Sequence, residues 1–130
     1  MGLTVPRDAL PGIEIPGTAE LMPAVRRAIA RGENVLVSPI LSLEAYEAAL
    51  EAYVAGLEAR AGRGEPLAGI ASFACFPDRG DGSWPVDPQL AYAHFEDVVE
   101  SERSITLRRL GAEPQWLVWR TPAPTTQGGF

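Results

Sequence analysis

Short apolar runs alternate along this chain with longer segments in which apolar residues recur every three or four positions. The short runs lie at 12–16, 34–41, 67–76 and 115–119. Runs of this length bounded by turn residues predict β-strands. The periodic segments lie at 23–31, 42–62 and 89–100, and a shorter one reaches Leu110. Their spacing predicts amphipathic helices, so strands and helices alternate as in parallel βαβ units of an α/β protein.

The segment 42–62 carries the clearest helical pattern. Ser42 suits an N-cap, because its hydroxyl accepts a hydrogen bond from a backbone N–H of the first turn. Gly62 suits the left-handed residue that ends a helix. The apolar stripe consists of Leu43, Tyr46, Leu50, Tyr53, Val54, Leu57 and Ala61. We expect this stripe to be buried and the glutamates between its members to face solvent.

The pattern leaves two architectures open. The run 67–76 is apolar throughout, as in a strand that is covered on both faces. An open doubly wound sheet and part of a (β/α) barrel both satisfy the order of elements. The segment 77–88 is rich in Pro, Gly and Asp and predicts a loop. We expect one domain over 1–130, with residues 1–11 as an arm and 122–130 as a flexible tail.

Composition and charge limit the kinds of partner and ligand that we expect this chain to bind. The net charge of -6 without a basic patch argues against nucleic acid, and no apolar run approaches the ~20 residues of a membrane helix. One cysteine, Cys75, and one histidine make a metal site unexpected, and no cofactor is predicted. A single cysteine and the lack of a signal-peptide pattern favour a reducing cytoplasm. All 11 basic residues are arginine, so these 130 residues contain no lysine.

Several segments carry a family likeness in order and spacing. Ile13–Thr18 reads IEIPGT, Asn34–Tyr46 reads NVLVSPILSLEAY and Ile70–Phe76 reads IASFACF. Leu90-Ala91-Tyr92 with Phe95-Glu96, and Gly111-Ala112 with Pro114-Gln115 and Leu117-x-Trp119, follow later. Together they resemble the bacterial transaldolases from Ile13 to Trp119. The resemblance implies a partial (β/α) barrel of about four parallel βα units, which is half of a TIM barrel.

Departures from the family pattern bear on the chemistry. The family's Schiff-base lysine stands where this chain has Glu14, and a carboxylate cannot form an imine with a ketose carbonyl. The resemblance places Ser38 at a family threonine and Cys75 at a family serine. It also matches Thr18 to a family threonine, and Arg79 to a phosphate-binding arginine in a loop one residue shorter. The early barrel strands, with an acid/base aspartate and glutamate, have no counterpart here.

We therefore expect a transaldolase-like protein that lacks the family reaction and acts as a sugar-phosphate-binding or assembly module. In that case Thr18, Cys75 and Arg79 bind the ligand. The alternative is an enzyme with lysine-independent chemistry on a phosphorylated sugar, with Glu14 as the acid/base and Ser38 as a second catalytic candidate. Its pocket would be lined by Glu14, Ser38, Cys75 and Arg79. Plainer explanations stand beside these: Glu14 in an abandoned site, Cys75 as a buried replacement, and Arg79 paired on the surface with Asp78 and Asp81.

A half-barrel leaves strand edges and an apolar concave face without partners. Two copies that meet about a two-fold axis would supply them, so we expect a homodimer. Two other arrangements remain open. Another chain with the early strands could complete the barrel, or the strands could form an open sheet with residues 1–11 covering one edge.

Overall fold

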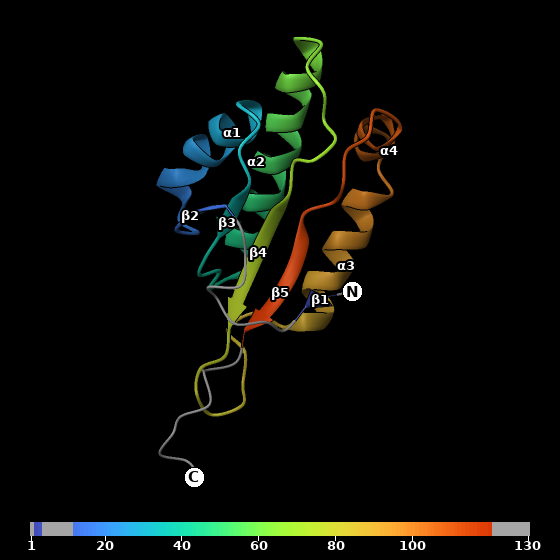
Figure 1. Cartoon of the computed structure of the whole chain (residues 1–130). Coiled ribbons are helices and arrows are strands. Elements are labelled where there is room, and N and C mark those ends of the chain that lie inside the picture. Colours follow the sequence, from blue (N-terminus) through green and yellow to red (C-terminus); the bar gives the residue numbers. More distant parts are fainter. Residues whose placement is uncertain (1, 4–11, 121–130) are drawn as a thin grey trace.

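A computed structural model describes residues 2–3 and 12–120 of the chain (Figure 1). Within these residues, five parallel strands form one sheet in the order β1-β5-β4-β3-β2. The strands are β1 Gly2–Leu3, β2 Ile13–Ile15, β3 Val35–Val37, β4 Ser72–Pro77 and β5 Trp116–Arg120. From β2 to β5 the strands are neighbours in chain order, which is how consecutive βα units of a barrel are arranged. The predicted half-barrel of parallel βα units is confirmed.

The helices pack together against one face of this sheet. They are the short 3-10 helix η2 Ala19–Leu21, α1 Met22–Ala30, α2 Leu43–Gly62, α3 Pro88–Val99 and α4 Glu102–Arg109. Figure 1 shows α1 and α2 behind the β2–β4 side, and α3 and α4 beside β5. The four α-helices agree with the predicted segments to within a residue or two at each end.

Side chains along the strands alternate between the helix-covered face and an inner face. The helix-covered face contributes Val35, Val37, Ala74, Phe76, Leu117 and Trp119 to the main core. The inner face carries a smaller cluster of Leu36, Cys75 and Val118, with Phe73 packed against it. The three cluster members are at most 3% exposed, so the central strands are buried on both faces, as the apolar run 67–76 predicts.

The predicted arm falls partly within the described residues. Gly2 and Leu3 form β1, which pairs in parallel with Leu117 and Val118 at the outer side of β5. A short strand from this segment therefore covers one edge of the sheet, as one of the alternatives requires. The rest of the predicted arm, residues 4–11, and the predicted tail, 122–130, lie outside the described residues.

Two predicted strands are too long. The run 34–41 yields only β3, because Pro39 has no N–H with which to continue the ladder that Ser38 ends. The run 67–76 yields β4 only from Ser72, because Gly69 has φ +87°, a left-handed conformation outside the strand region. Leu67 is nevertheless buried, so apolar character here indicates burial rather than strand.

Helix α2 begins as predicted, but the left-handed residue after it lies two residues later than predicted. The hydroxyl of Ser42 accepts a hydrogen bond from the N–H of Ala45 at 3.0 Å. Gly62 is the last helical residue, and the left-handed residue is Gly64, at φ +75°. The predicted left-handed conformation of Gly62 is therefore wrong, because the helix continues through this glycine and the left-handed residue follows it.

Helix α1 crosses α2 closely at Gly56. A Cβ atom at this position would stand 2.7 Å from the carbonyl oxygen of Arg26 and 2.8 Å from the Cβ of Ile29. Both distances are shorter than any normal contact, so the crossing requires a residue without a side chain. This contact holds α1 against the middle of α2 and thereby fixes the helices that flank β3.

Candidate functional site

The inner face at the carboxyl ends of the strands is where parallel barrels bind ligands. The strand register arranges its residues in rows. The innermost row is Glu14, Leu36, Phe73 and Trp116. The middle row contains Cys75 and Val118, level with Ser38 at the end of β3. The outermost row contains Pro77 and Arg120.

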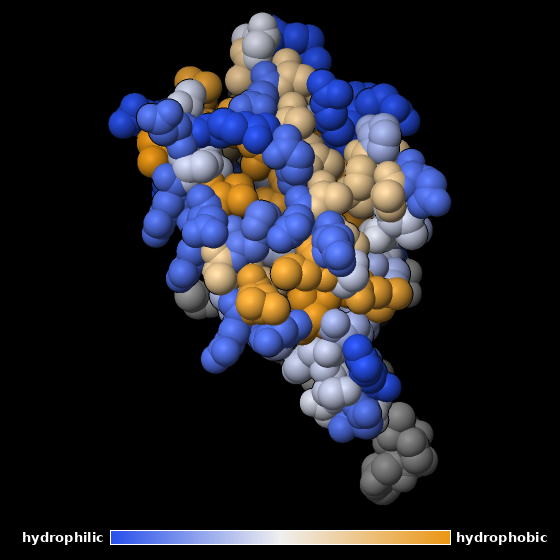
Figure 2. All heavy atoms as spheres, turned by 180° about the vertical axis from the view of Figure 1, so that it is seen from behind, coloured by the Kyte–Doolittle hydropathy of each residue, from blue (hydrophilic) through white to orange (hydrophobic). Residues whose placement is uncertain are grey.

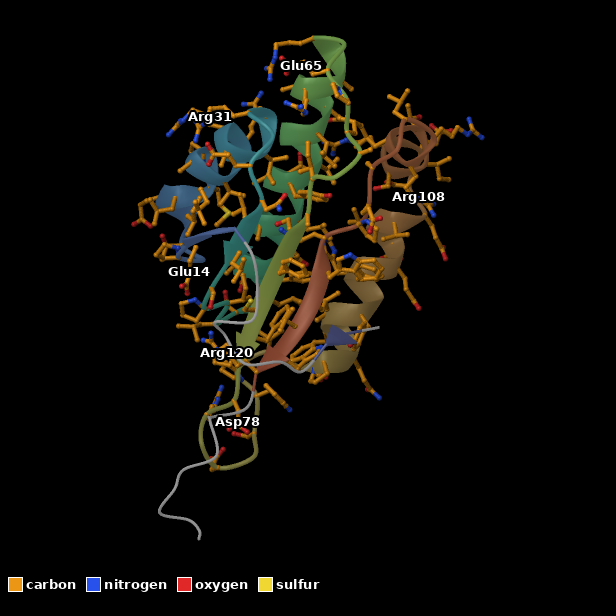
Figure 3. All side chains as sticks on the ribbon, in the orientation of Figure 1. Glu14, Arg31, Glu65, Asp78, Arg108 and Arg120 are labelled. Atoms are coloured by element: carbon orange, nitrogen blue, oxygen red, sulfur yellow. The ribbon has the colours of Figure 1, made fainter. Side chains whose placement is uncertain are left out.

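Glu14 lies in the innermost row, in the middle of β2. Its side chain is exposed, whereas its register partner Leu36 is buried. The structure therefore places Glu14 on the same face as Ser38 and Cys75, as the resemblance implies. Figure 3 shows Glu14 on the β2 side of the sheet, away from the loop that carries Asp78.

Ser38 and Cys75 lie on neighbouring strands in the middle row. Ser38 is 2% exposed, and its hydroxyl oxygen has no hydrogen-bond partner among residues 2–3 and 12–120. Cys75 is fully buried in the cluster with Leu36 and Val118. These apolar surroundings are typical of a structural cysteine rather than of an activated nucleophile.

Thr18 and Arg79 lie beyond the strand ends and are both exposed. Thr18 precedes η2 without capping it through its side chain. Arg79 is in the loop between β4 and α3, where its backbone N–H donates to the carbonyl of Ser83 at 2.9 Å. Within the described part of the chain its guanidinium forms no ion pair with Asp78 or Asp81, although its charge helps to lower the pKa of Asp81.

The two aspartates hold the loop itself. The carboxylate of Asp78 accepts a hydrogen bond from the N–H of Gly80. Asp81 accepts from the N–H of Ser83 at 2.9 Å and from its hydroxyl at 2.5 Å. The hydroxyl bond first, and the backbone bond second, lower the pKa of Asp81 below its usual value. The loop around Arg79 is therefore shaped by its own carboxylates, while the guanidinium remains at the surface.

Arg120 is a site residue that the sequence analysis missed. It ends β5 in the outermost row, and its carbonyl accepts a hydrogen bond from the N–H of Asp78 at 3.1 Å. Its Nη1 atom is buried and has no hydrogen-bond partner in the described ranges. Figure 3 shows Arg120 at the carboxyl edge of the sheet, between Glu14 and Asp78. Strand alternation from Trp116 would have predicted its face, had the predicted strand not ended at Trp119.

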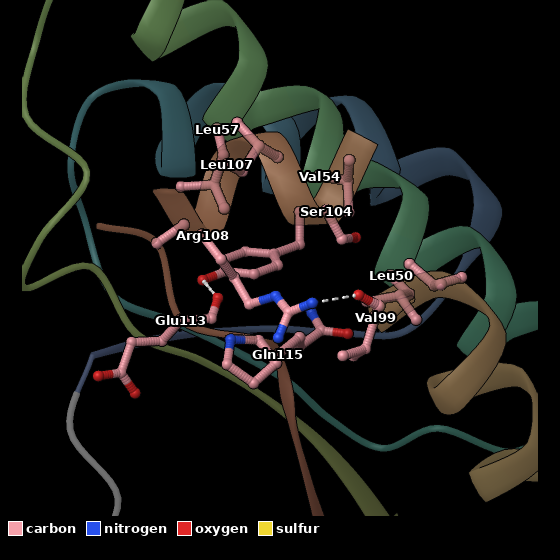
Figure 4. A pocket seen from close by; sticks show the side chains of 13 residues that line it. Leu50, Val54, Leu57, Val99, Ser104, Leu107, Arg108, Glu113 and Gln115 are labelled. Atoms are coloured by element: carbon pink, nitrogen blue, oxygen red, sulfur yellow. Dashed lines mark hydrogen bonds between the residues drawn. The ribbon is translucent and has the colours of Figure 1, made fainter. Parts of the chain in front are cut away.

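A small hollow lies at the other end of β5, between α2, α3 and α4 (Figure 4). Its volume is about 20 Å³, which accommodates one water molecule. Gln115 donates from Nε2 to the hydroxyl of Ser72 at 3.0 Å, while its Oε1 is buried without a partner among the described residues. The remaining wall is mainly aliphatic, including Leu50, Val54, Leu57 and Leu107. This hollow is too small for a sugar phosphate.

The described residues contain neither a cluster that could bind a metal ion nor a helix that could span a membrane. No group of three or more His, Cys, Asp or Glu side chains in 2–3 and 12–120 could hold a metal ion. Over the same ranges, no helix has both the length and the apolar character needed to cross a membrane. On the inner face, Glu14 supplies a carboxylate, Ser38 a hydroxyl and Arg120 a guanidinium.

Comparison with known proteins identifies the relationship. The chain is 33% identical to a transaldolase of Trichodesmium erythraeum over 136 residues, and 34% to one of Saccharopolyspora erythraea over 126 residues. A transaldolase of Thermobifida fusca is 35% identical over 129 residues. Each match covers 82% of this chain. The chain is related to the transaldolase family.

The relationship covers only part of the family's length. This chain spans 36%, 34% and 35% of the three transaldolases, about a third of each. No protein-family model matches the chain. The half-barrel described above is therefore a transaldolase-related fold, and the transaldolases' own reaction does not follow from the likeness.

Proposed function

We propose that this chain is a transaldolase-related sugar-phosphate-binding or assembly module that does not carry out the transaldolase reaction. The observation that carries the proposal is Glu14 on the inner face of β2, at the position that resemblance assigns to the Schiff-base lysine. A carboxylate cannot condense with a ketose, and the 130 residues supply no lysine elsewhere. Adding the early strands from another chain would not alter this, because the position belongs to β2.

Borohydride trapping with fructose 6-phosphate tests this proposal. We expect no covalent adduct on any side chain by peptide mass mapping, because no side-chain amine is present to form an imine. The matched variant is Glu14→Lys, in which an adduct on the introduced lysine would show that the position faces a bound ketose. A side-chain adduct on the unmodified chain would contradict the proposal.

A second function is supported by one observation. Glu14, Ser38 and Cys75 share the inner face, so a carboxylate and a hydroxyl belong to the same side of the sheet. In this alternative, Glu14 moves a proton on a phosphorylated sugar without an imine. Turnover that is lost in Glu14→Gln with ligand binding retained would favour it. The control is Glu44→Gln in α2, which removes an exposed carboxylate of a helix rather than of a strand.

The assembly part of the proposal concerns the half-barrel itself. Within the described residues the outer side of β2 pairs with no strand, whereas β5 is covered by β1. A second copy, or another chain that supplies further strands, would extend the sheet at β2. We propose a homodimer. A cytoplasmic location likewise stays a prediction from the single cysteine, Cys75.

A further inference from the structure

We propose that Arg120 and Ser38 form an oxyanion site for a phosphoryl group at the carboxyl edge of the half-barrel. The inference rests on the proposed binding role. It assigns the phosphate to a residue of β5 rather than to Arg79, which the resemblance suggests.

The first argument is the environment of the Arg120 guanidinium. Its Nη1 atom is buried, and within 2–3 and 12–120 no acceptor lies within hydrogen-bond distance. A buried donor without an acceptor is unfavourable, and it is more so when the group is charged. An oxyanion would supply both the acceptor and the opposite charge, so the site gains more from an anion than from a neutral ligand.

The second argument is the hydroxyl of Ser38. Ser38 is 2% exposed, and its oxygen also lacks a partner among the described residues. Ser38 and Arg120 lie on the same face, with only β4 between their strands, and their rows are adjacent. Since neighbouring strands are about 4.8 Å apart, the long arginine side chain can reach across β4 towards β3. One anion can then accept from both donors.

The third argument concerns the kind of anion. A guanidinium presents several N–H groups in a plane and binds phosphate or carboxylate with two parallel hydrogen bonds. A phosphoryl group has three terminal oxygens, so two can bind the guanidinium while the third accepts from a hydroxyl. Arg79 offers neither arrangement, because it is exposed and its loop is shaped by Asp78 and Asp81.

Calorimetric titration of the chain with inorganic phosphate, against a chloride control of equal ionic strength, tests the site. We expect saturable binding that weakens about tenfold or more in Arg120→Met, because charge-assisted hydrogen bonds are lost. Ser38→Ala should weaken binding by a smaller factor. The matched control is Arg79→Met, which removes an exposed arginine near the same edge and should leave affinity unchanged.

Three results would overturn the inference: no saturable binding to the unmodified chain, unchanged binding in a folded Arg120→Met, or loss of binding in Arg79→Met alone. If Arg120→Met does not fold by circular dichroism, the unmodified chain provides the second measurement. Phosphate should then slow phenylglyoxal modification of Arg120 and not of Arg79 in peptide mapping. Equal rates at Arg120 with and without phosphate would sink the proposal.

Titrations with fructose 6-phosphate and fructose separate this inference from the proposed function. If fructose 6-phosphate binds no more tightly than phosphate, the sugar-binding role fails while the Arg120 site stands. If fructose 6-phosphate binds and Arg120→Met leaves its affinity unchanged, the Arg120 site fails while the sugar-binding role stands.

Discussion

Four side chains carry buried polar atoms that have no hydrogen-bond partner within 2–3 and 12–120: Ser38, Tyr46, Gln115 and Arg120. These atoms differ in the group that could form the missing hydrogen bond. Ser38 and Arg120 are at the carboxyl edge, and Gln115 borders a hollow that accommodates water. The hydroxyl of Tyr46 is enclosed in the core, where its ring packs edge-on against Phe76 at 5.3 Å. A missing partner therefore marks a candidate ligand site only at the carboxyl edge, where parallel barrels bind their ligands.

Tyr53 and Tyr46 form a matched pair for measuring the value of one buried hydrogen bond. Both are at most 1% exposed on α2, and burial raises the pKa of each phenol well above its usual value. Tyr53 donates to the carbonyl of Glu113 at 2.6 Å, whereas Tyr46 has no partner in the described residues.

We expect Tyr53→Phe to lower the free energy of unfolding by about 1 kcal/mol, because one hydrogen bond is lost. Tyr46→Phe should be neutral or slightly stabilising, because it removes an unsatisfied polar atom. Urea denaturation followed by circular dichroism measures both. Equal losses in the two variants would contradict this account of the core.

At the scale of elements, the contact between α1 and α2 depends on Gly56. We expect Gly56→Ala to destabilise the protein by about 1–3 kcal/mol. The free-energy cost of the clash between the added methyl group and α1 exceeds the gain in helix propensity from alanine. The control is Gly62→Ala at the end of the same helix, where no atom lies within 4 Å of the added Cβ. That variant should be neutral or more stable by up to about 1 kcal/mol. The midpoints of urea unfolding compare the two.

Helix α4 is joined to α2 by Arg103. Its guanidinium donates to Glu51 at 2.9 and 3.0 Å and to Glu58 at 2.8 and 2.9 Å. The hydrogen bond from Arg103 lowers the pKa of Glu58, and the two carboxylates raise the pKa of Arg103 further. All three groups are largely exposed, so solvent screens the network.

The lowered pKa of Glu58 determines how the stability of the protein depends on pH. A carboxyl whose pKa is lower when folded stabilises the protein above its unfolded pKa of about 4.3, and this stability disappears as the pH falls through the folded value. We expect Arg103→Met to cost up to about 1 kcal/mol at pH 7 and less as the pH falls below about 4. The control is Arg109→Met, an exposed residue of the same helix. A pH-independent cost would indicate lost packing rather than lost charge pairing.

At the scale of the molecule, the exposed surface bears on assembly. The large apolar side chains that remain exposed are Ile13, Leu41, Leu90 and Leu110, at 44–57%. Figure 2 shows apolar groups gathered on the lower part of the helix-covered side, among mostly polar side chains. The inner-face cluster of Leu36, Cys75 and Val118 is by contrast already buried within one chain. A second copy is therefore not needed to cover that cluster. The part of the molecule that it would cover is the unpaired side of β2.

We expect light scattering at micromolar concentration to show a homodimer, held through the β2 side of the sheet. Because Ile13 is 44% exposed on that strand, Ile13→Arg should shift the equilibrium towards monomer by placing a charge in the contact. Leu110→Arg, at an exposed position at the end of α4, is the control and should leave the mass unchanged. A stable monomer of the unmodified chain would count against this assembly.

The sequence predicts the order and kind of the main elements because those depend on local signals. The apolar periodicity defines α1 to α4, and Ser42 marks the start of α2 through one short-range hydrogen bond. Strand lengths are predicted less well, since the runs 34–41 and 67–76 mix strand with buried irregular backbone. Apolar character reports burial, whereas a strand also requires an unbroken ladder to a neighbour that may be distant in sequence.

The candidate site shows the same division. Glu14, Ser38 and Cys75 follow from residue type and order, and the sequence by itself shows that these 130 residues contain no lysine. The tertiary structure decided that Thr18 and Arg79 lie outside the inner face, that β1 covers β5, and that the Nη1 atom of Arg120 is buried at the edge. Register and burial arise from contacts between segments far apart in the chain, and no local pattern contains them.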